Sequence, residues 1–249
     1  MFRKLLKIAG SLALSIFMVG TLAFTSSECN DAVCNNIEII FENDELIKLS
    51  NDELIRLIKA TDNTILNKKL SEINSEIIEL AVEKHQAVLN AEVYKVIEKD
   101  SSSFKGIVAV KVKHREPVVR IISESASYYL DEFGDIIPIS PNYTANVLAT
   151  TGYFSEKFAI EQLLPFVLYI EKNDFWQAQI EQIHIEKNGE VILIPLVGEH
   201  IIEFGKLEDY QKKLKKMKAF YEQIVAKNNW NKYKQVSLKY NNQVIAKRR

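Results

Sequence analysis

The residues of this chain that could do chemistry form no recognised catalytic or metal-binding pattern. No HExxH or His-x-His spacing joins the four histidines, which are His85, His114, His184 and His200. The sequence also lacks a G-x-S-x-G elbow, a Walker loop and a G-x-G-x-x-G fingerprint, and its 8 glycines leave little room for phosphate-binding loops. We therefore predict no metal, no cofactor and no small-molecule substrate.

The densest group of carboxylates lies in the segment DEFGD, which contains Asp131, Glu132 and Asp135. Acidic residues and glycine are typical of turns, and no set of nucleophile, base and orienting group can be identified beside them. We expect no catalytic residue here or elsewhere, and we predict that the protein is not an enzyme. A secreted enzyme remains a third hypothesis, because catalytic residues can converge from distant positions.

The composition narrows the choice of partners. Lys+Arg 32 against Asp+Glu 33 gives a formal net charge of −1, so the chain has no broad cationic field of the kind that holds nucleic acid. Its 249 residues, 47% of them hydrophobic, suffice for a membrane anchor and one or two compact domains. We expect no nucleic-acid partner.

The segment from Ile8 to Ser27 is uncharged and mostly apolar at its centre, LALSIFMVGTLAF. About 20 helical residues cross a hydrocarbon core of about 30 Å, so the segment predicts a transmembrane helix. The positive-inside rule then places residues 1–7 in the cytoplasm and the rest of the chain outside. The basic residues that set this orientation are Arg3, Lys4 and Lys7. A cleaved signal peptide has the same order of features and remains the alternative.

Two cysteines, Cys29 and Cys34, follow this segment. An oxidising compartment would permit a short-range disulfide between them, and the chain offers no further ligands at zinc-binding spacing. Glu28 disfavours a lipoprotein signal ending at Cys29, because a small residue is expected at that position.

The next part of the chain predicts the order β-α-α-β-β. The segment 51–60 is an amphipathic helix, and 71–84 repeats the pattern with an apolar face formed by Ile73, Ile77, Leu80 and Ala81. β-branched and alternating segments predict strands at 33–41, 90–98 and 107–114. Pro117, within HREPVVRI, favours extended backbone and places a domain boundary at 117–122.

The remainder predicts a β-rich domain with flanking helices. Hairpins are expected around DEFGD and around KNGE, whose Asn-Gly pair favours a tight turn. A helix over 155–171 should kink or split at Pro165. A second helix, 207–225, carries a lysine-rich face that we interpret as solvated. The last strand should place Val236, Leu238 and Tyr240 on one side and Ser237 and Lys239 on the other.

Taken in order, these segments resemble the FtsQ/DivIB cell-division family, in the form found in Bacteroidetes. The similarity covers nearly the whole chain and rests on HREPVVRI, SYYLDEFGDIIPIS, FWQAQIEQI, HIIEFGKLEDYQKKLKKMKAFY and SLKYNNQVIA. It implies an α+β protein with an N-terminal transmembrane helix at 8–27. A POTRA domain at 33–117, a mixed β domain at 118–246 and a basic tail at 247–249 would follow.

The resemblance also implies a function. A member of this family would be an inner-membrane scaffold at the division septum, with its C-terminal domain in the periplasm. It would bind FtsB/FtsL-like proteins and other divisome components, and would help to regulate septal peptidoglycan synthesis.

By the same resemblance, the partner site would lie on the terminal edge strand, which offers unpaired backbone groups to an added strand. The corresponding residues here are Leu238, Lys239, Tyr240, Asn242 and Gln243. Tyr240 would be the principal contact. In a regular strand, however, Tyr240 would point to the same side as Val236 and Leu238, so a buried position in the core is equally possible. Arg115 and Pro117 match the end of the family's POTRA module. Two roles are possible for them there: a junction between domains that the proline fixes, or a surface that recruits other division proteins.

The alternative is another POTRA-containing protein of envelope assembly or secretion. In an outer-membrane member of that class, a barrel of regularly alternating strands would follow the POTRA module. Two substantial predicted helices beyond residue 120 disfavour it.

Overall fold

The computed structural model describes residues 10–21, 32–42, 49–99, 104–124, 126–140, 143–225, 230–241 and 243–249. The described residues from 32 to His114 belong to one compact unit, and those from Arg115 onward form a second.

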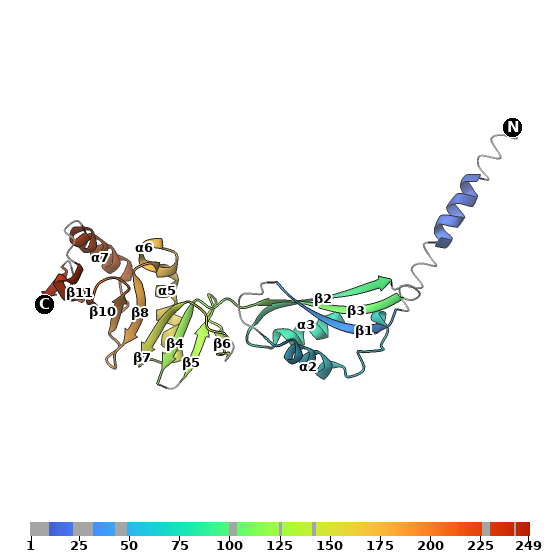
Figure 1. Cartoon of the computed structure of the whole chain (residues 1–249), viewed down its shortest axis with the longest axis horizontal. Helices are drawn as coiled ribbons and strands as arrows, with labels where there is room; N and C mark the ends of the chain where they lie inside the picture. The colour runs from blue at the N-terminus through green and yellow to red at the C-terminus, as the bar shows by residue number, and fades with distance from the viewer. Residues whose placement is uncertain are drawn as a thin grey trace. The chain divides into compact units, whose positions relative to one another are not determined.

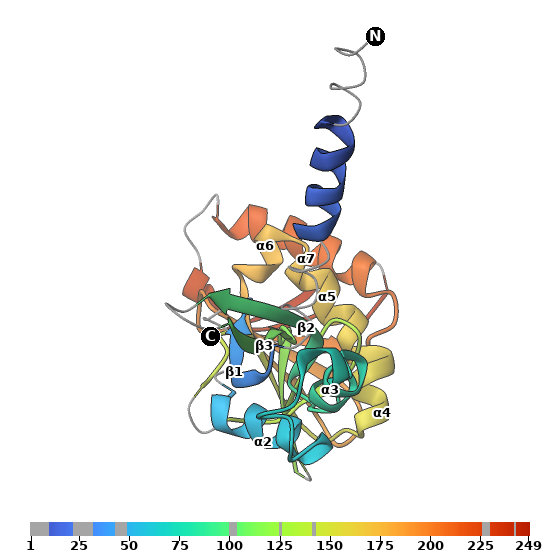
Figure 2. The same cartoon turned by 90° about the vertical axis from the view of Figure 1, so that its right-hand side faces the viewer.

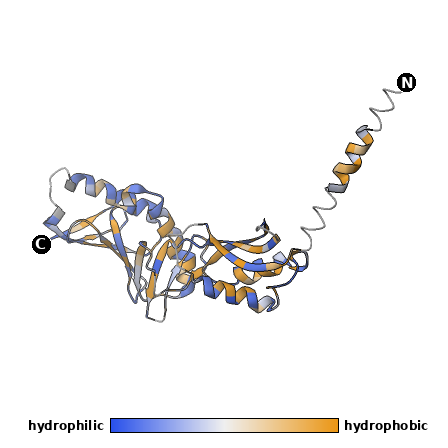
Figure 3. Ribbon diagram, turned by 45° about the vertical axis from the view of Figure 1, so that its right-hand side comes forward, coloured by the Kyte–Doolittle hydropathy of each residue, from blue (hydrophilic) through white to orange (hydrophobic). Residues whose placement is uncertain are grey.

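The N-terminal segment is helical over residues 10–21, and its ribbon is largely orange, the colour of hydrophobic residues, in Figure 3. The large apolar side chains of this helix are exposed. The predicted transmembrane helix, 8–27, extends beyond these residues on both sides, into parts of the chain outside the described residues. Within the described part of the chain, no helix has the length and apolar character needed to span a membrane.

The first unit has the predicted β-α-α-β-β order (Figure 1). Its sheet has the order β1-β3-β2, in which β1 is parallel to β3 and β2 is antiparallel to it. Helices α2 and α3 cover one face of these strands (Figure 2). The elements are β1 (Cys34–Phe41), α2 (Asn51–Thr61), the 3-10 turn η1 (Leu70–Glu72), α3 (Ser75–Glu83), β2 (Val88–Lys99) and β3 (Phe104–His114).

The predicted apolar face of the second helix is wrong. Ile77 and Leu80 are 52% and 54% exposed, whereas Ile78 and Val82 are buried. The helix begins at Ser75 and is capped by Asn74, so Ile73 lies in the preceding turn and does not set the helical phase.

Two hydrogen bonds join α3 to the edge strand β2 in this orientation. The carboxylates of Glu79 and Glu83 accept hydrogen bonds from the backbone N–H groups of Val93 and Ala91, at 2.8 and 3.1 Å. These bonds occupy two of the backbone donors that an added strand would need at the edge of β2.

The second unit is a nine-stranded mixed sheet in the order β12-β11-β10-β9-β8-β7-β4-β5-β6. Its strands are β4 (Val119–Ser123), β5 (Ser127–Leu130), β6 (Ile136–Ile137), β7 (Leu148–Gly152), β8 (Ile180–Ile185), β9 (Val191–Pro195), β10 (Ile201–Gly205), β11 (Tyr233–Ser237) and β12 (Ile245–Arg248). Its helical elements are α4 (Glu156–Phe158), η2 (Ala159–Leu163), α5 (Leu164–Glu171), α6 (Asp174–Gln177), α7 (Tyr210–Val225) and η3 (Trp230–Lys232).

The helix that was predicted to kink or split at Pro165 is not split, since residues 156–171 are helical without a break. The segment α4-η2-α5 contains a π-helical turn at η2, in which the N–H of Leu164 bonds to the carbonyl of Ala159, and Pro165 follows in the first turn of α5. A proline lacks the N–H that a regular helix uses for its hydrogen bonds, and the π-helical turn lies directly before this proline.

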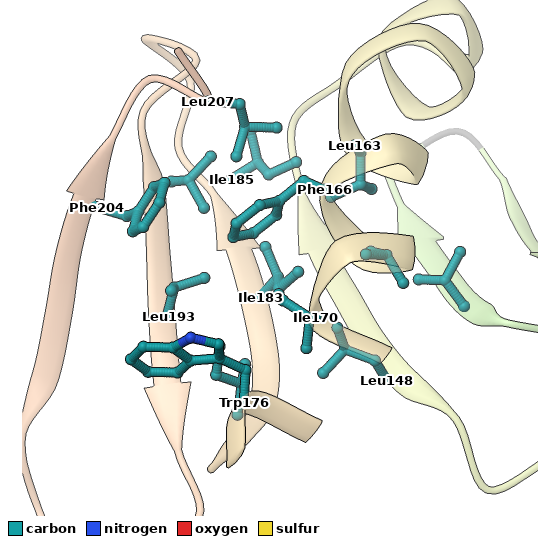
Figure 4. Close-up of a cluster of buried hydrophobic side chains, with 14 of the residues drawn as sticks. Leu148, Leu163, Phe166, Ile170, Trp176, Ile183, Ile185, Leu193, Phe204 and Leu207 are labelled. Carbon is teal, nitrogen blue, oxygen red and sulfur yellow. The ribbon is translucent and has the colours of Figure 1, made fainter. Parts of the chain in front are cut away.

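The core of the second unit lies between the helices and one face of the sheet (Figure 4). Phe166 and Ile170 of α5 point toward Ile183, Leu193 and Phe204 of the strands. The rings of Phe166 and Phe204 are 5.1 Å apart. Full burial of each such side chain contributes about 1.5 to 3 kcal/mol, so this packing holds the strands that carry the C-terminal surface.

Candidate partner-binding surface

The C-terminal segment forms two strands where one was predicted. β11 ends at Ser237, and β12 begins at Ile245 and returns antiparallel to it. The sequence KYNNQ between them is rich in residues that favour turns. Residues 247 and 248, predicted to lie in a basic tail, belong to β12.

The predicted partner residues therefore lie in the connection between β11 and β12. Leu238 is fully buried, and its N–H bonds to the carbonyl of Glu203 at 2.9 Å. Tyr240 is 53% exposed, so the structure places it at the surface and not in the core. The alternation that would have buried it stops when β11 ends. Gln243 is exposed, and Asn242 lies outside the described residues.

Lys216 of α7 and Glu190 of the turn between β8 and β9 hold this connection. Lys216 of α7 donates a hydrogen bond from Nζ to the carbonyl of Tyr240 at 3.1 Å. Lys239 forms an ion pair with Glu190, with Nζ and Oε2 2.6 Å apart. The hydrogen bond between them raises the pKa of Lys239 and lowers that of Glu190. Both contacts constrain the backbone on which Tyr240 is displayed.

Gly205, at the end of β10, allows Lys239 to approach closely. Its φ is +76°, and a Cβ at this position would lie 3.2 Å from Cγ of Lys239. Only glycine adopts this backbone conformation without strain while leaving space for the neighbouring side chain.

Strand β12 is the terminal strand of the sheet, and no described strand pairs with its outer edge. Ile245, Lys247 and Arg248 are exposed along it. The strand is fixed beyond its end by Arg249, whose N–H bonds to the carbonyl of Lys232 and whose guanidinium lies 2.6 Å from the carboxylate of Glu199. An edge strand fixed in this way can accept one further strand.

A buried polar pair joins α7 to the start of β10. The Nε2 atom of His200 lies 2.9 Å from the hydroxyl of Tyr221. Burial, with a smaller effect from the charge of Arg249, lowers the pKa of His200. Burial raises the pKa of the Tyr221 hydroxyl. The pair is therefore held in its neutral form, consistent with a structural role.

The residues predicted at the end of the POTRA module anchor the start of the second unit. Arg115 forms ion pairs of 2.7 and 2.6 Å with Asp131 and Asp135. Oδ1 of Asp131 accepts the N–H groups of Phe133 and Asp135, so these acidic residues organise the DEFGD turn. Pro117 is buried. All of these contacts lie within the second unit.

The described residues contain no group of three or more His, Cys, Asp and Glu side chains able to hold a metal. Cys34 is buried, its thiol lies 3.4 Å from the carbonyl of Asn36, and burial raises its pKa. Cys29, the other half of the possible disulfide, lies outside the described residues.

Two parts of this surface were not predicted from the sequence. The lysines of α7 were interpreted as solvated, although Lys213 bonds to the carbonyls of Phe204 and Lys206 and Lys216 to that of Tyr240. β12 was not separated from β11, although consecutive asparagines gave a usable turn signal.

Comparison with protein-family models assigns both parts of the chain. Residues 116–247 match the family described as FtsQ/DivIB, C-terminal related. Residues 32–100 match the POTRA-like domain, and this match covers the first unit from β1 to the end of β2, before β3 begins. A comparison with curated protein sequences finds no match. Since the first model spans more than half of the 249 residues, the chain belongs to the FtsQ/DivIB family.

Proposed function

We propose that this protein is a cell-division scaffold that binds FtsB/FtsL-like proteins through the C-terminal edge of its nine-stranded sheet. Family membership supports the role in division. The observation that carries the binding site is the open edge of β12 beside the exposed Tyr240. An extended partner segment would complete the ladder along β12, and Tyr240 would supply rigid contact area beside it.

The arrangement suits binding better than chemistry. Tyr240 is exposed, yet its backbone is held by Lys216 and the adjoining Lys239 is held by Glu190. An exposed side chain whose backbone is already held in place loses little conformational entropy when a partner binds. We propose that the protein acts by this contact and has no catalytic activity of its own.

We further propose that residues 8–27 anchor the chain in the inner membrane, with residues 1–7 in the cytoplasm and the two domains in the periplasm at the septum. The charge-free segment and the basic residues before it support this topology. Regulation of septal peptidoglycan synthesis would follow from partner recruitment.

A pull-down from detergent-solubilised membranes of the source bacterium tests the function. The full chain should recover small bitopic division proteins, and Tyr240→Ala should recover at least tenfold less. Phe133→Ala is the matched control, because Phe133 is an exposed aromatic residue, 68% accessible, on a different turn of the same unit. Recovery of outer-membrane assembly factors in place of division proteins would favour the alternative POTRA-containing class.

A further inference from the structure

The lysine-rich side of α7 lines a cavity next to the connection that carries Tyr240. The cavity has a volume of about 600 Å³. α7 appears largely blue in the hydropathy view (Figure 3). The polar residues around the cavity are Asp209, Lys212, Lys213, Lys215, Lys216 and Asn241.

Two of these lysines are fixed by backbone carbonyls. Lys213 reaches the carbonyls of Phe204 and Lys206 at 3.2 and 2.6 Å, and Lys216 reaches that of Tyr240 at 3.1 Å. Each ammonium group has three donors, so the bond to Tyr240 leaves Lys216 with donor capacity. These hydrogen bonds hold the ammonium groups of Lys213 and Lys216 at fixed positions in the cavity wall, whereas the ammonium group of a freely solvated lysine would be mobile.

The other two lysines are available to an incoming anion. Lys212 lies 3.0 Å from Asp209, but both side chains are well exposed, and ion pairs of this kind contribute only about 0.2 to 1 kcal/mol. Lys215 is exposed on the next part of the same helix. A bound carboxylate could therefore engage these ammonium groups with little competing cost.

The electrostatic setting favours an anion. Four lysines and one aspartate line the cavity, in a chain whose net charge is only −1. Burial lowers the pKa of Lys213; the charges of Glu208 and Asp209 act in the opposite direction, and that of Lys216 acts in the same direction as burial. A negative group bound between Lys213 and Lys216 would relieve the repulsion between these two lysines.

We propose that this cavity binds an acidic segment of the protein partner, through aspartate or glutamate side chains. Asn241, which lines the cavity, directly follows Tyr240, so one partner could occupy β12, Tyr240 and the cavity together. The near-neutral chain lacks the broad cationic surface expected for a nucleic acid. This inference rests on the proposed function, and it adds the chemical class of the partner.

The test uses the full chain in detergent micelles and a fluorescein-labelled peptide of alternating glutamate and serine. Fluorescence anisotropy should show binding that weakens as salt rises, since exposed charges are screened. The variant Lys212→Glu/Lys215→Glu should bind the peptide at least tenfold more weakly, and the same peptide with glutamine in place of glutamate should not bind. Lys213 and Lys216 stay unchanged, so the contacts that hold the backbone are kept.

Lys157→Glu/Lys172→Glu is the matched control, with the same change of charge at exposed positions of the same unit. Its affinity for the peptide should stay within twofold of the unmodified chain. Equal loss in both variants would overturn the proposal, as would lysine-dependent binding of phosphatidylglycerol vesicles or inorganic phosphate without binding of the peptide.

Tyr240→Ala separates this inference from the proposed function. It should leave the affinity for the glutamate peptide within twofold while it reduces recovery of division proteins. If the peptide binds as expected but no division protein is recovered, the function fails and the anion site stands. If division proteins are recovered but the peptide does not bind, the proposal that the cavity binds an acidic segment is rejected and the proposed function stands.

Discussion

Lys216 and Tyr240 lie 24 positions apart in the sequence, and a hydrogen bond of 3.1 Å joins the Nζ atom of the first to the backbone carbonyl of the second. The bond connects the lysine-rich side of α7 to the connection between β11 and β12. The side chain of Tyr240 remains free to contact a partner while its backbone is held.

Replacement of Lys216 by methionine should loosen this connection without unfolding the domain. Methionine keeps the apolar stem and removes the donor, so amide hydrogen exchange of residues 239–241 should become faster, and affinity for the division partner should fall about threefold. Hydrogen exchange followed by mass spectrometry measures the first effect. Lys172→Met, at an exposed position of the same unit outside the cavity, should change neither. Equal exchange in both variants would show that the Lys216 bond does not hold the connection.

Gly205→Ala should destabilise the second unit more than Gly189→Ala does. Both glycines have nearly the same φ, +76° and +77°, but a Cβ at Gly205 meets Cγ of Lys239 at 3.2 Å, whereas nothing lies within 4 Å at Gly189. The shared backbone strain costs about 1 kcal/mol in each, and the contact should add to it only at Gly205. Chemical denaturation measures the free energy of unfolding of both variants. Equal losses of stability would contradict the claim that Lys239 approaches Gly205 closely.

Arg115→Met should lower the free energy of unfolding by about 2 kcal/mol, because it leaves the buried carboxylate of Asp131 without its cationic partner. In an Asp131→Asn background the same replacement should cost less than half as much. The double-mutant cycle, measured by denaturant unfolding, isolates the pair. Additive effects of the two changes would contradict an anchoring role for this contact.

The stability of the second unit should fall as the pH drops through about 6.5, the ordinary pKa of histidine. Burial lowers the pKa of His200 in the folded state, so the unfolded chain binds this proton more readily. The stability that neutral His200 contributes is fully present above about pH 6.5. Below this pH the free energy of unfolding falls by at most about 1.4 kcal/mol per pH unit, until the pH is below the folded-state pKa of His200. Denaturant unfolding across this pH range measures it.

His200→Gln should flatten that pH dependence. Tyr221→Phe, which removes the hydrogen bond but keeps the histidine, should lower stability at every pH and preserve the slope. An unchanged slope in His200→Gln would assign the pH dependence to other groups.

Local sequence patterns predicted the elements whose structure depends on local interactions. The order of strands and helices in the first unit follows from periodicity, and the Asn-Gly pair of KNGE forms the turn between β8 and β9, with Gly189 at φ +77°. Pro165 likewise marks an irregular helical turn, because its missing N–H acts locally.

Contacts between distant segments escaped prediction. On α3, Glu79 and Glu83 bond to the edge of β2, and apolar periodicity carries no information about such bonds. The partner of Lys216 is likewise determined only when α7 packs beside the end of β11. For the candidate site, the resemblance indicated a segment, whereas the exposure of Tyr240 within that segment depends on where β11 ends.

Site-specific photo-crosslinking tests the central claim, that β12 is the partner-binding edge, most directly. A photoreactive amino acid at Lys247, exposed on β12, should yield a crosslink to a small bitopic division protein, identified by mass spectrometry of the adduct from membranes. The same group at Lys187, exposed in the turn between β8 and β9, should not. A division-protein crosslink from position 187 with none from position 247 would contradict the account.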